Sequence, residues 1–501
     1  MAIFFAFVLW LLPYFAGSVI VDGFQSLGAV SDSSKPLDLH WPLVGTFMGY
    51  QQAWGFHWPG WPLLRSLALP LIPRTTWIDL LLLSLIWSTC SWYVIRISSP
   101  RSSTFFRVTT YIIAVLAPGY LVAAQSYRPE IVTALCLLII LHYWQAKETL
   151  PKWMRTTALT ILPLLHPLGF VIPVTWFSWD FLGESKKIGI AKASKNITRR
   201  AWPLILGALL FCSWFALQPD AWAQFQLNVK SQRQLVDGLG AGWNTFFVWA
   251  IGSRDTLPLV GIIFGAMLGS LLFIKPVLKR QELGSEFQKF IYSALGVWIA
   301  LVFNIVAKNP NSLHLVAILP MCIILHVNLI DRVSKAIHPI LFPVGMFTTL
   351  LVLSIYPLKY TYNIYQNDGR SYRSEIVASL DTLPHADRVL IPVAFWEAAL
   401  EKQKDTGQIY QFSTFPNILN RSERTIYEQQ TLSNVKAGDL LVWDPLQELG
   451  GVFNFVEITA LRHQVICPPS QPDLWEEIQR IHIPTDYSKG QPVEFLVYRK
   501  R

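Results

Sequence analysis

The segment Trp153–Trp179, with the sequence WMRTTALTILPLLHPLGFVIPVTWFSW, decides the fold. It is apolar and long enough to cross a hydrocarbon layer of about 30 Å. Its middle carries helix-breaking residues at Pro163, Pro167, Gly169 and Pro173. Irregular backbone at membrane depth is tolerated where protein or a water-filled cavity satisfies its polar groups. We therefore expect two short helices that enter the membrane and return to the same side.

The distribution of Lys and Arg favours this hairpin. Strict alternation of single spans would place the basic stretch 186–200 outside, against the positive-inside rule. With the hairpin, 18 basic residues fall in cytoplasmic loops and 5 in short outer loops. The inner set is Arg96, Arg101, Arg107, Lys147, Lys152, Arg155, Lys186, Lys187, Lys192, Lys195, Arg199, Arg200, Lys275, Lys279, Arg280, Lys289, Arg332 and Lys335; the outer set is Arg128, Lys230, Arg233, Arg254 and Lys308.

The composition of the whole chain agrees with a membrane protein. Its 501 residues are 52% hydrophobic and 15% charged, whereas soluble domains are about 25% charged. This excludes a disordered chain and a small disulfide scaffold, and the recurring apolar runs argue against an ordinary soluble globule. The net charge of +9 sits in loops between apolar runs, so it sets membrane orientation, and we expect no nucleic-acid partner. The other apolar runs are 2–21, 77–95, 108–125, 131–146, 201–217, 257–274, 290–306, 313–329 and 338–356.

These runs predict a multi-spanning α-helical protein with about eleven membrane helices, including the re-entrant pair. The first span, Ala2–Val21, is expected to be a retained anchor with its N-terminus inside. The transmembrane domain is residues 1–357, within which 22–76 forms a large outer first loop with surface helices. Residues 358–501 form a small extracytoplasmic α/β domain. On the seventh run Gly261, Gly265 and Gly269 form a small-residue ridge suited to close helix packing.

The tail contains segments typical of both strands and helices. Strands are expected at 388–393 and 439–444, and a turn at Lys436–Asp439 precedes the second of them. Helices are expected at Trp396–Lys404 and Asp473–Arg480. No glycine-rich nucleotide loop is present in this tail.

The polar residues of the first outer loop are the first candidates for chemistry. Asp22 follows the first span directly, where a carboxylate could act as a base toward a lipid-borne substrate; an interfacial cap is the structural alternative. His57 lies in the aromatic stretch 50–64, in which Pro and Gly alternate with Trp. Such a loop is expected to lie on the membrane and to wall a site, although a lone histidine is more often structural than catalytic.

Further candidates lie in the other outer loops. Arg128 and Glu130 flank Pro129 at the head of a helix, and charges this close to hydrocarbon are costly enough to suggest function; a structural Arg–Glu pair is the alternative. Lys308 and His314 lie in a second short loop, where a phosphate contact is plausible. Lys230 and Arg233 lie in the long outer loop and either contact an acceptor or are simply solvated. We expect Lys230 and Arg233, together with His57 and Glu130, to bind substrate.

The order of these features resembles the GT-C superfamily of membrane glycosyltransferases, especially its protein-mannosyltransferase and aminoarabinose-transferase-like branch. The resemblance covers about residues 1–357. The matching features are Asp22 after the first helix, His57-Trp-Pro in the outer loop, Arg128-Pro-Glu130 at a helix start, His166-Pro-Leu-Gly in the broken pair, and Lys308 to His314-Leu-Val-Ala-Ile-Leu-Pro320. The family often has Asp-Glu and His-Pro-Pro where this chain has Asp22-Gly23 and His57-Trp-Pro.

The resemblance implies transfer of a hexosyl or pentosyl unit from a polyprenyl-phosphate donor to a glycan, lipid or protein acceptor at the outer face. Asp22 is then the general base of an inverting displacement, and Arg128, Lys308 and His314 hold the donor phosphate. No cofactor and no metal is expected. The expected location is a bacterial plasma membrane, with the active site and the C-terminal domain on the extracytoplasmic side.

Other functions remain open at this stage. A polysaccharide ligase or polymerase would use a lipid-diphosphate donor and would place its catalytic groups in a large late outer loop. A lipid or solute transporter would show an internal repeat and charges at mid-membrane, and the sequence shows neither clearly. A catalytically inactive scaffold is consistent with Gly23 in place of a second acid.

Overall fold

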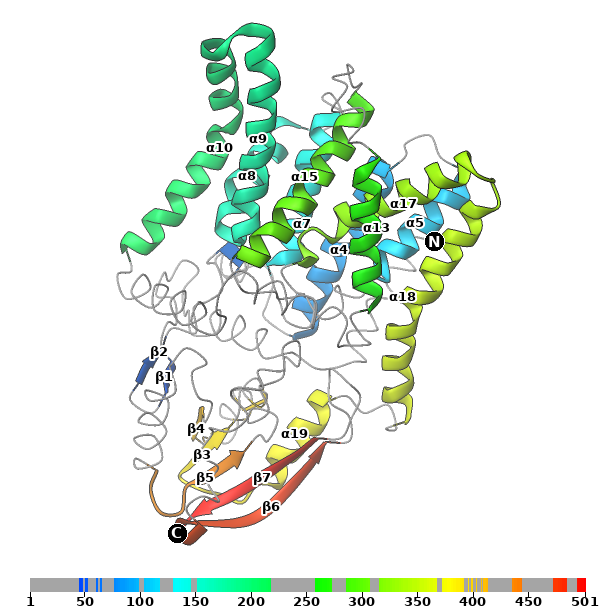
Figure 1. Ribbon diagram of the computed structural model, residues 1–501. Helices are drawn as coiled ribbons and strands as arrows, with labels where there is room; N and C mark the ends of the chain where they lie inside the picture. The colour runs from blue at the N-terminus through cyan, green and yellow to red at the C-terminus, as the bar shows by residue number, and fades with distance from the viewer. Residues whose placement is uncertain are drawn as a thin grey trace.

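The computed structural model describes a helical bundle and, beyond one end of it, a smaller domain built on a sheet (Figure 1). The described residues are 45–47, 50–52, 60–61, 64, 76–98, 103–117, 129–145, 151–217, 257–272, 285–306, 315–366, 372–391, 395, 398–399, 402, 407, 409–412, 435–443, 472–483 and 493–501.

The bundle is formed by long helices that share one apolar core. Their bounds are α4 (Thr76–Ser98), α5 (Thr104–Val115), α7 (Glu130–Gln145), α8 (Lys152–Leu165), α9 (Pro167–Ile188), α10 (Ile190–Leu217), α13 (Leu257–Leu271), α15 (Ser285–Val306), α17 (Leu319–Ala336) and α18 (Leu341–Gln366). Within the described residues, one helical segment, Gln288–Val306, is long and apolar enough to cross a membrane. Shorter apolar helices cover 104–115, 130–144, 259–271 and 341–355. The count of about eleven spans stays a prediction.

Helices α7 and α8 run in opposite directions. At one end the guanidinium of Arg155 lies 5.0 Å from the ring centre of Tyr143, and at the other end Glu130 lies beside His166. A residue near the start of α8 therefore contacts the end of α7, and the reverse holds at the opposite end. The two helices fold back on each other over their whole length.

The broken segment forms the expected pair of helices. Only His166 separates α8 from α9. Arg200 of α10 contacts Arg155, near the start of α8, and Asp180, near the end of α9. The start of α8 and the end of α9 therefore lie at the same end of the bundle, which confirms the predicted reversal at His166-Pro167. We call this end, which carries Lys152, Arg155 and the basic stretch 186–200, the basic end.

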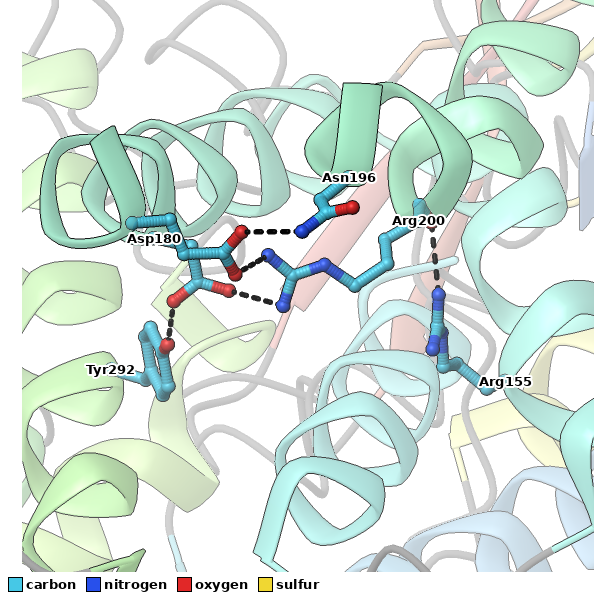
Figure 2. A network of polar contacts seen from close by, with 6 residues as sticks. Arg155, Asp180, Asn196, Arg200 and Tyr292 are labelled. Carbon is cyan, nitrogen blue, oxygen red and sulfur yellow. Dashed lines mark hydrogen bonds and ion pairs between the residues drawn. The ribbon is translucent and has the colours of Figure 1, made fainter. Parts of the chain in front are cut away.

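A polar network ties four helices together at the basic end (Figure 2). Arg200 binds Asp180 at 3.2 Å and also binds Glu184, both on α9. Asp180 accepts a hydrogen bond from Tyr292 of α15, and Arg155 of α8 donates to the carbonyl oxygen of Arg200 at 3.0 Å. The network therefore fixes the α9–α10 hairpin against α8 and α15.

The glycine ridge packs against α17 at two of its three positions. A Cβ on Gly265 would lie 2.0 Å from Nδ1 of His326, and a Cβ on Gly269 would lie 2.6 Å from the carbonyl oxygen of Leu325. Gly261 has no neighbour within 4 Å of its Cβ position. Close packing is thus confirmed for Gly265 and Gly269, whereas Gly261 lies beyond the contact.

The end of the chain forms a five-stranded mixed sheet with one helix against it. The strand order is β4-β3-β5-β7-β6, in which β3 is parallel to β4 and β5, and β7 is antiparallel to β5 and β6. The elements are α19 (Tyr372–Thr382), β3 (Arg388–Ile391), β4 (Ile409–Phe412), β5 (Leu440–Trp443), β6 (Trp475–Ile483) and β7 (Val493–Lys500). Ile376 and Leu380 of α19 share a core with residues of β3, β5, β6 and β7.

The predicted strands at 388–393 and 439–444 correspond to β3 and β5. The predicted turn is also present: Gly438 has a φ of 90°, and the Asp439 carboxylate accepts the N–H of Lys436 at 2.8 Å. The same carboxylate binds Arg388 of β3. This turn therefore joins β5 to its neighbour through a side chain as well as through the sheet.

The prediction of a helix at Asp473–Arg480 is wrong. After a single 3-10 turn, Pro472–Leu474, the segment forms β6, paired antiparallel with β7. Glu, Gln and Arg favour a helix in isolation, but strand propensity depends on the partner surface. Here Ile481 and Ile483 are buried in the core that contains α19, whereas Trp475 is buried in a second cluster on the other face of the sheet. The register shift between Glu477 and Gln479 accounts for the change of face. Most of the other predicted helix, Trp396–Lys404, lies outside the described residues.

Candidate functional site

Of the residues proposed from the sequence, Glu130 is the one that the described part of the chain contains. The others lie outside the described residues: Asp22, His57, Arg128, Lys230, Arg233, Lys308 and His314. The first span also lies outside them. The site is therefore built here from Glu130 and from the groups that the fold brings to it.

Glu130 is the first residue of α7 and is completely buried. Both the N–H and the hydroxyl of Thr133 donate to the carbonyl oxygen of Pro129, at 2.8 and 2.9 Å, which closes the first turn. A carboxylate at this position is stabilised by the exposed N–H groups and the dipole of the helix. Burial alone would make an ionised Glu130 energetically costly, so the helix start offsets part of that cost.

The residue facing Glu130 is His166, at the reversal between α8 and α9. Its Nε2 lies 3.6 Å from Oε1 of Glu130, and the two side chains are 4% and 0% exposed. Its Nδ1 accepts the N–H of Leu168 at 3.1 Å, so His166 caps the start of α9. Because Nδ1 acts as an acceptor there, the ring proton belongs on Nε2, toward the carboxylate.

The backbone N–H and carbonyl groups of the tight turn at His166 form hydrogen bonds within the turn. The N–H of His166 donates to the carbonyl oxygen of Leu162 at 3.3 Å, and its carbonyl oxygen accepts the N–H of Gly169 at 2.8 Å. A Cβ on Gly169 would lie 2.4 Å from the carbonyl oxygen of Leu162, so glycine allows α9 to start directly against the end of α8. This is how a reversal with one connecting residue remains compatible with a membrane interior.

The length of α8 separates the Glu130–His166 pair from the basic end. Trp153 and Trp179, both exposed, mark the interface at the basic end. His166 follows Trp153 by 13 residues of mostly helical chain, which is a rise of about 20 Å. A hydrocarbon layer is about 30 Å thick, so a helix of this length is too short to cross it completely.

Part of the first outer loop lies against this turn. Gly60 packs so closely on the end of α8 that a Cβ there would lie 2.7 Å from the carbonyl oxygen of Leu164. Trp61 is 8% exposed and belongs to the bundle core. The described part of the aromatic loop is therefore folded onto the end of the α8–α9 pair, close in sequence to His57.

The described residues bring together a buried carboxyl group and an imidazole, 3.6 Å apart, where the start of α7, the end of α8 and the start of α9 meet. The contact links the start of α7 to the α8–α9 turn. In the described part of the chain, no three His, Cys, Asp or Glu side chains gather as a metal site would require. The expectation of a reaction without a cofactor stays a prediction.

The sequence places His166 in the broken segment but does not by itself assign it to the site. The signal was present in His166-Pro-Leu-Gly, since a histidine before a proline at a helix start is placed to cap it. What the sequence lacked was the contact itself, because Glu130 and His166 belong to different helices.

The comparisons with known proteins give a match at the level of structure. No family model and no curated protein sequence matches the chain. Among solved structures, ArnT from Cupriavidus metallidurans bound to undecaprenyl phosphate is similar, with a TM-score of 0.55 and 10% identity, covering 99% of this chain and 97% of that one. The same protein in the apo state gives a TM-score of 0.54 and 11% identity with the same coverage.

The match extends over both parts of the chain, the bundle and the C-terminal domain. ArnT is a GT-C aminoarabinose transferase, so the resemblance drawn from the order of the sequence motifs is confirmed for the fold. The protein thus has the fold seen in ArnT.

Proposed function

We propose that this protein transfers a sugar from a polyprenyl-phosphate donor to an acceptor at the outer face of the membrane. The observation that carries the proposal is the near full-length similarity to ArnT, one of whose structures holds undecaprenyl phosphate. The sugar is hexosyl or pentosyl, and the acceptor is a glycan, a lipid or a protein.

Asp22 is proposed as the general base. It would take the proton from the acceptor nucleophile while that atom attacks the anomeric carbon on the face opposite the phosphate. The new glycosidic bond forms as the bond from the anomeric carbon to the phosphate oxygen breaks. Configuration is then inverted, and polyprenyl phosphate leaves with the bonding electrons.

The leaving phosphate gains negative charge in this step and needs positive partners. Arg128 and Lys308 are proposed to supply them, with His314 as a further donor. His57, Lys230 and Arg233 are proposed to contact the sugar or the acceptor.

Glu130 and His166 are proposed to act on the substrate site chiefly through position. Glu130 is buried, and Arg128 precedes it by two residues, so a fixed start of α7 limits where the arginine can lie. The contact with His166 fixes that start against the α8–α9 turn. Loss of the pair would therefore weaken donor binding more than it changes the chemical step.

The proposed location is the bacterial plasma membrane, with the site and the C-terminal domain on the extracytoplasmic side. This orientation is supported by the gathering of Lys152, Arg155 and the stretch 186–200 at one end of the bundle and by the domain beyond the other (Figure 1). A lipid-diphosphate donor, as in a polysaccharide ligase or polymerase, is the alternative substrate.

The experiment is sugar transfer by the purified protein in lipid. Polyprenyl-phosphate sugars are offered together with candidate acceptors, and free polyprenyl phosphate is measured, with lipid-diphosphate donors in parallel. Release from the monophosphate donor by the wild type but not by Asp22→Asn would support the proposal. Release from the diphosphate donor alone would overturn it in favour of the ligase.

Two variants test the positioning role. Glu130→Gln removes the charge and keeps the volume, and His166→Asn keeps an N-cap acceptor while it removes the imidazole. Both should raise the donor KM about ten-fold or more with a smaller change in kcat, which is the pattern of lost binding. Glu476→Gln, at an exposed site on β6, is the matched control and should behave as wild type. Unchanged KM in both site variants would contradict the role.

A further inference from the structure

One face of α10 changes in character along its length. Lys192, Lys195, Arg199 and Trp202 are spaced by three, four and three residues, which places them on one side of the helix. All four are exposed. Farther down the same side, Ile205 and Leu209 are exposed, at 47% and 58%.

The acids of this hairpin are turned away from that face. Asp180 and Glu184 both bind Arg200, and Asp180 also binds Tyr292 (Figure 2). Between residues 185 and 199 the sequence contains no Asp or Glu. Both acids of the α9–α10 hairpin are thus bound to Arg200, and among the described residues no ion pair is found for Lys192, Lys195 or Arg199.

The order of these side chains matches the layers of a lipid leaflet. Trp202, 52% exposed, is level with Trp179, since Asp180 contacts Arg200, and tryptophans of this kind mark the interface. Arg199 lies about 5 Å and Lys195 about 10 Å above Trp202 along the helix. A headgroup layer is about 5–8 Å deep, so both cations reach it with their side chains. Leu209 lies about 10 Å below, at acyl-chain depth.

From this arrangement we propose that the outward face of α10 binds an anionic phospholipid of the leaflet at the basic end. Lys195 and Arg199 bind the headgroup, with Lys192 above them, and Trp202 lies against the interfacial region. The aliphatic residues below it contact the acyl chains. This site is at the opposite end of the bundle from the Glu130–His166 pair and is independent of the proposed transfer reaction.

Charge complementarity selects an anionic headgroup. Each Lys or Arg close to an anionic membrane surface contributes enough attraction to change binding about five-fold. Two such residues beside one headgroup thus give up to about 25-fold, and a zwitterionic lipid would gain much less. The α9 side of the hairpin supplies Lys186 and Lys187 near the tip, which do not continue the α10 row.

The experiment is native mass spectrometry of the full chain in detergent, titrated separately with phosphatidylglycerol and with phosphatidylcholine of the same acyl chains. The quantity compared is the ratio of the dissociation constants for the first bound lipid. The wild type should prefer phosphatidylglycerol about ten-fold or more. The double variant Lys195→Gln with Arg199→Gln should lower that preference at least five-fold.

A second pair of basic residues on the same hairpin serves as a control for the position of the lipid site. Lys186→Gln with Lys187→Gln removes the same charge from the same hairpin and should leave the preference within two-fold of wild type. The charge-conserving pair Lys195→Arg with Arg199→Lys should also keep it. Equal loss in both glutamine pairs, or no preference for phosphatidylglycerol in the wild type, would overturn the proposal.

Discussion

Replacing Gly169 by alanine tests the construction of the α8–α9 turn. The added Cβ would lie 2.4 Å from the carbonyl oxygen of Leu162, whereas ordinary contacts begin at 3.4 Å, so the shortfall is about 1 Å. The atom in the way belongs to the backbone of the last turn of α8 and cannot rotate aside. The start of α9 must therefore move away from α8.

The expected cost follows from overpacking a closed site. Inserting a methyl group into well-packed structure costs about 1–3 kcal/mol, and a backbone obstacle favours the upper part of that range. We expect the free energy of unfolding to fall by about 2–3 kcal/mol. The displacement also carries His166 away from Glu130, so the donor KM should rise together with the loss of stability.

The control lies in the same helix. A Cβ on Gly183 meets nothing within 4 Å, and alanine is favoured over glycine in a helix by about 1 kcal/mol. Gly183→Ala should therefore be neutral or stabilising, which separates the two variants by about 3 kcal/mol. The assay is chemical unfolding in mixed micelles, followed by tryptophan fluorescence, alongside the transfer reaction.

The result that refutes this reasoning is a Gly169→Ala protein as stable as wild type. It would mean that α9 starts farther from α8 than described. A Gly169→Ala protein with wild-type stability and a raised donor KM would mean that the glycine affects donor binding without affecting stability.

Three further predictions concern other parts of the fold. Gly265→Ala should destabilise the α13–α17 contact by about 1–3 kcal/mol in the same unfolding assay, whereas Gly261→Ala should not. Asp439→Ala should cost about 2–3 kcal/mol, because it leaves Arg388 without its carboxylate, and faster amide hydrogen exchange in β3 and β5 would show it. Trp176→Phe removes a 2.8 Å hydrogen bond to the α15 backbone and should cost about 1–2 kcal/mol, measured against wild type in micelles; an unchanged midpoint would argue against that bond.

The features that followed from the sequence are those with local physical causes. The reversal at His166 was predictable because proline and glycine interrupt a helix and because the positions of Lys and Arg required the chain to return to the same side. The turn ending at Asp439 was predictable because Gly438 accepts a positive φ and a carboxylate can bind nearby N–H groups.

The features that did not follow depend on partners distant in the chain. Strand β6 has a helix-favouring composition and becomes a strand because β7 offers an edge and a surface for Trp475. The contact between Glu130 and His166 needs α7 and α8 to be antiparallel before it exists. Neither propensity nor spacing contains that information.

The single residue between α8 and α9 has a consequence for the biogenesis of the protein. At the basic end, the start of α8 carries Lys152 and the last turn of α9 carries Lys186. At the reversal between the two helices the polar residue is His166, whose backbone and Nδ1 already form hydrogen bonds within the turn. Membrane insertion of the pair thus requires no hydrophilic loop to be carried through the hydrocarbon. The two helices can enter the bilayer laterally as one closed hairpin, with both ends retained on the side of synthesis.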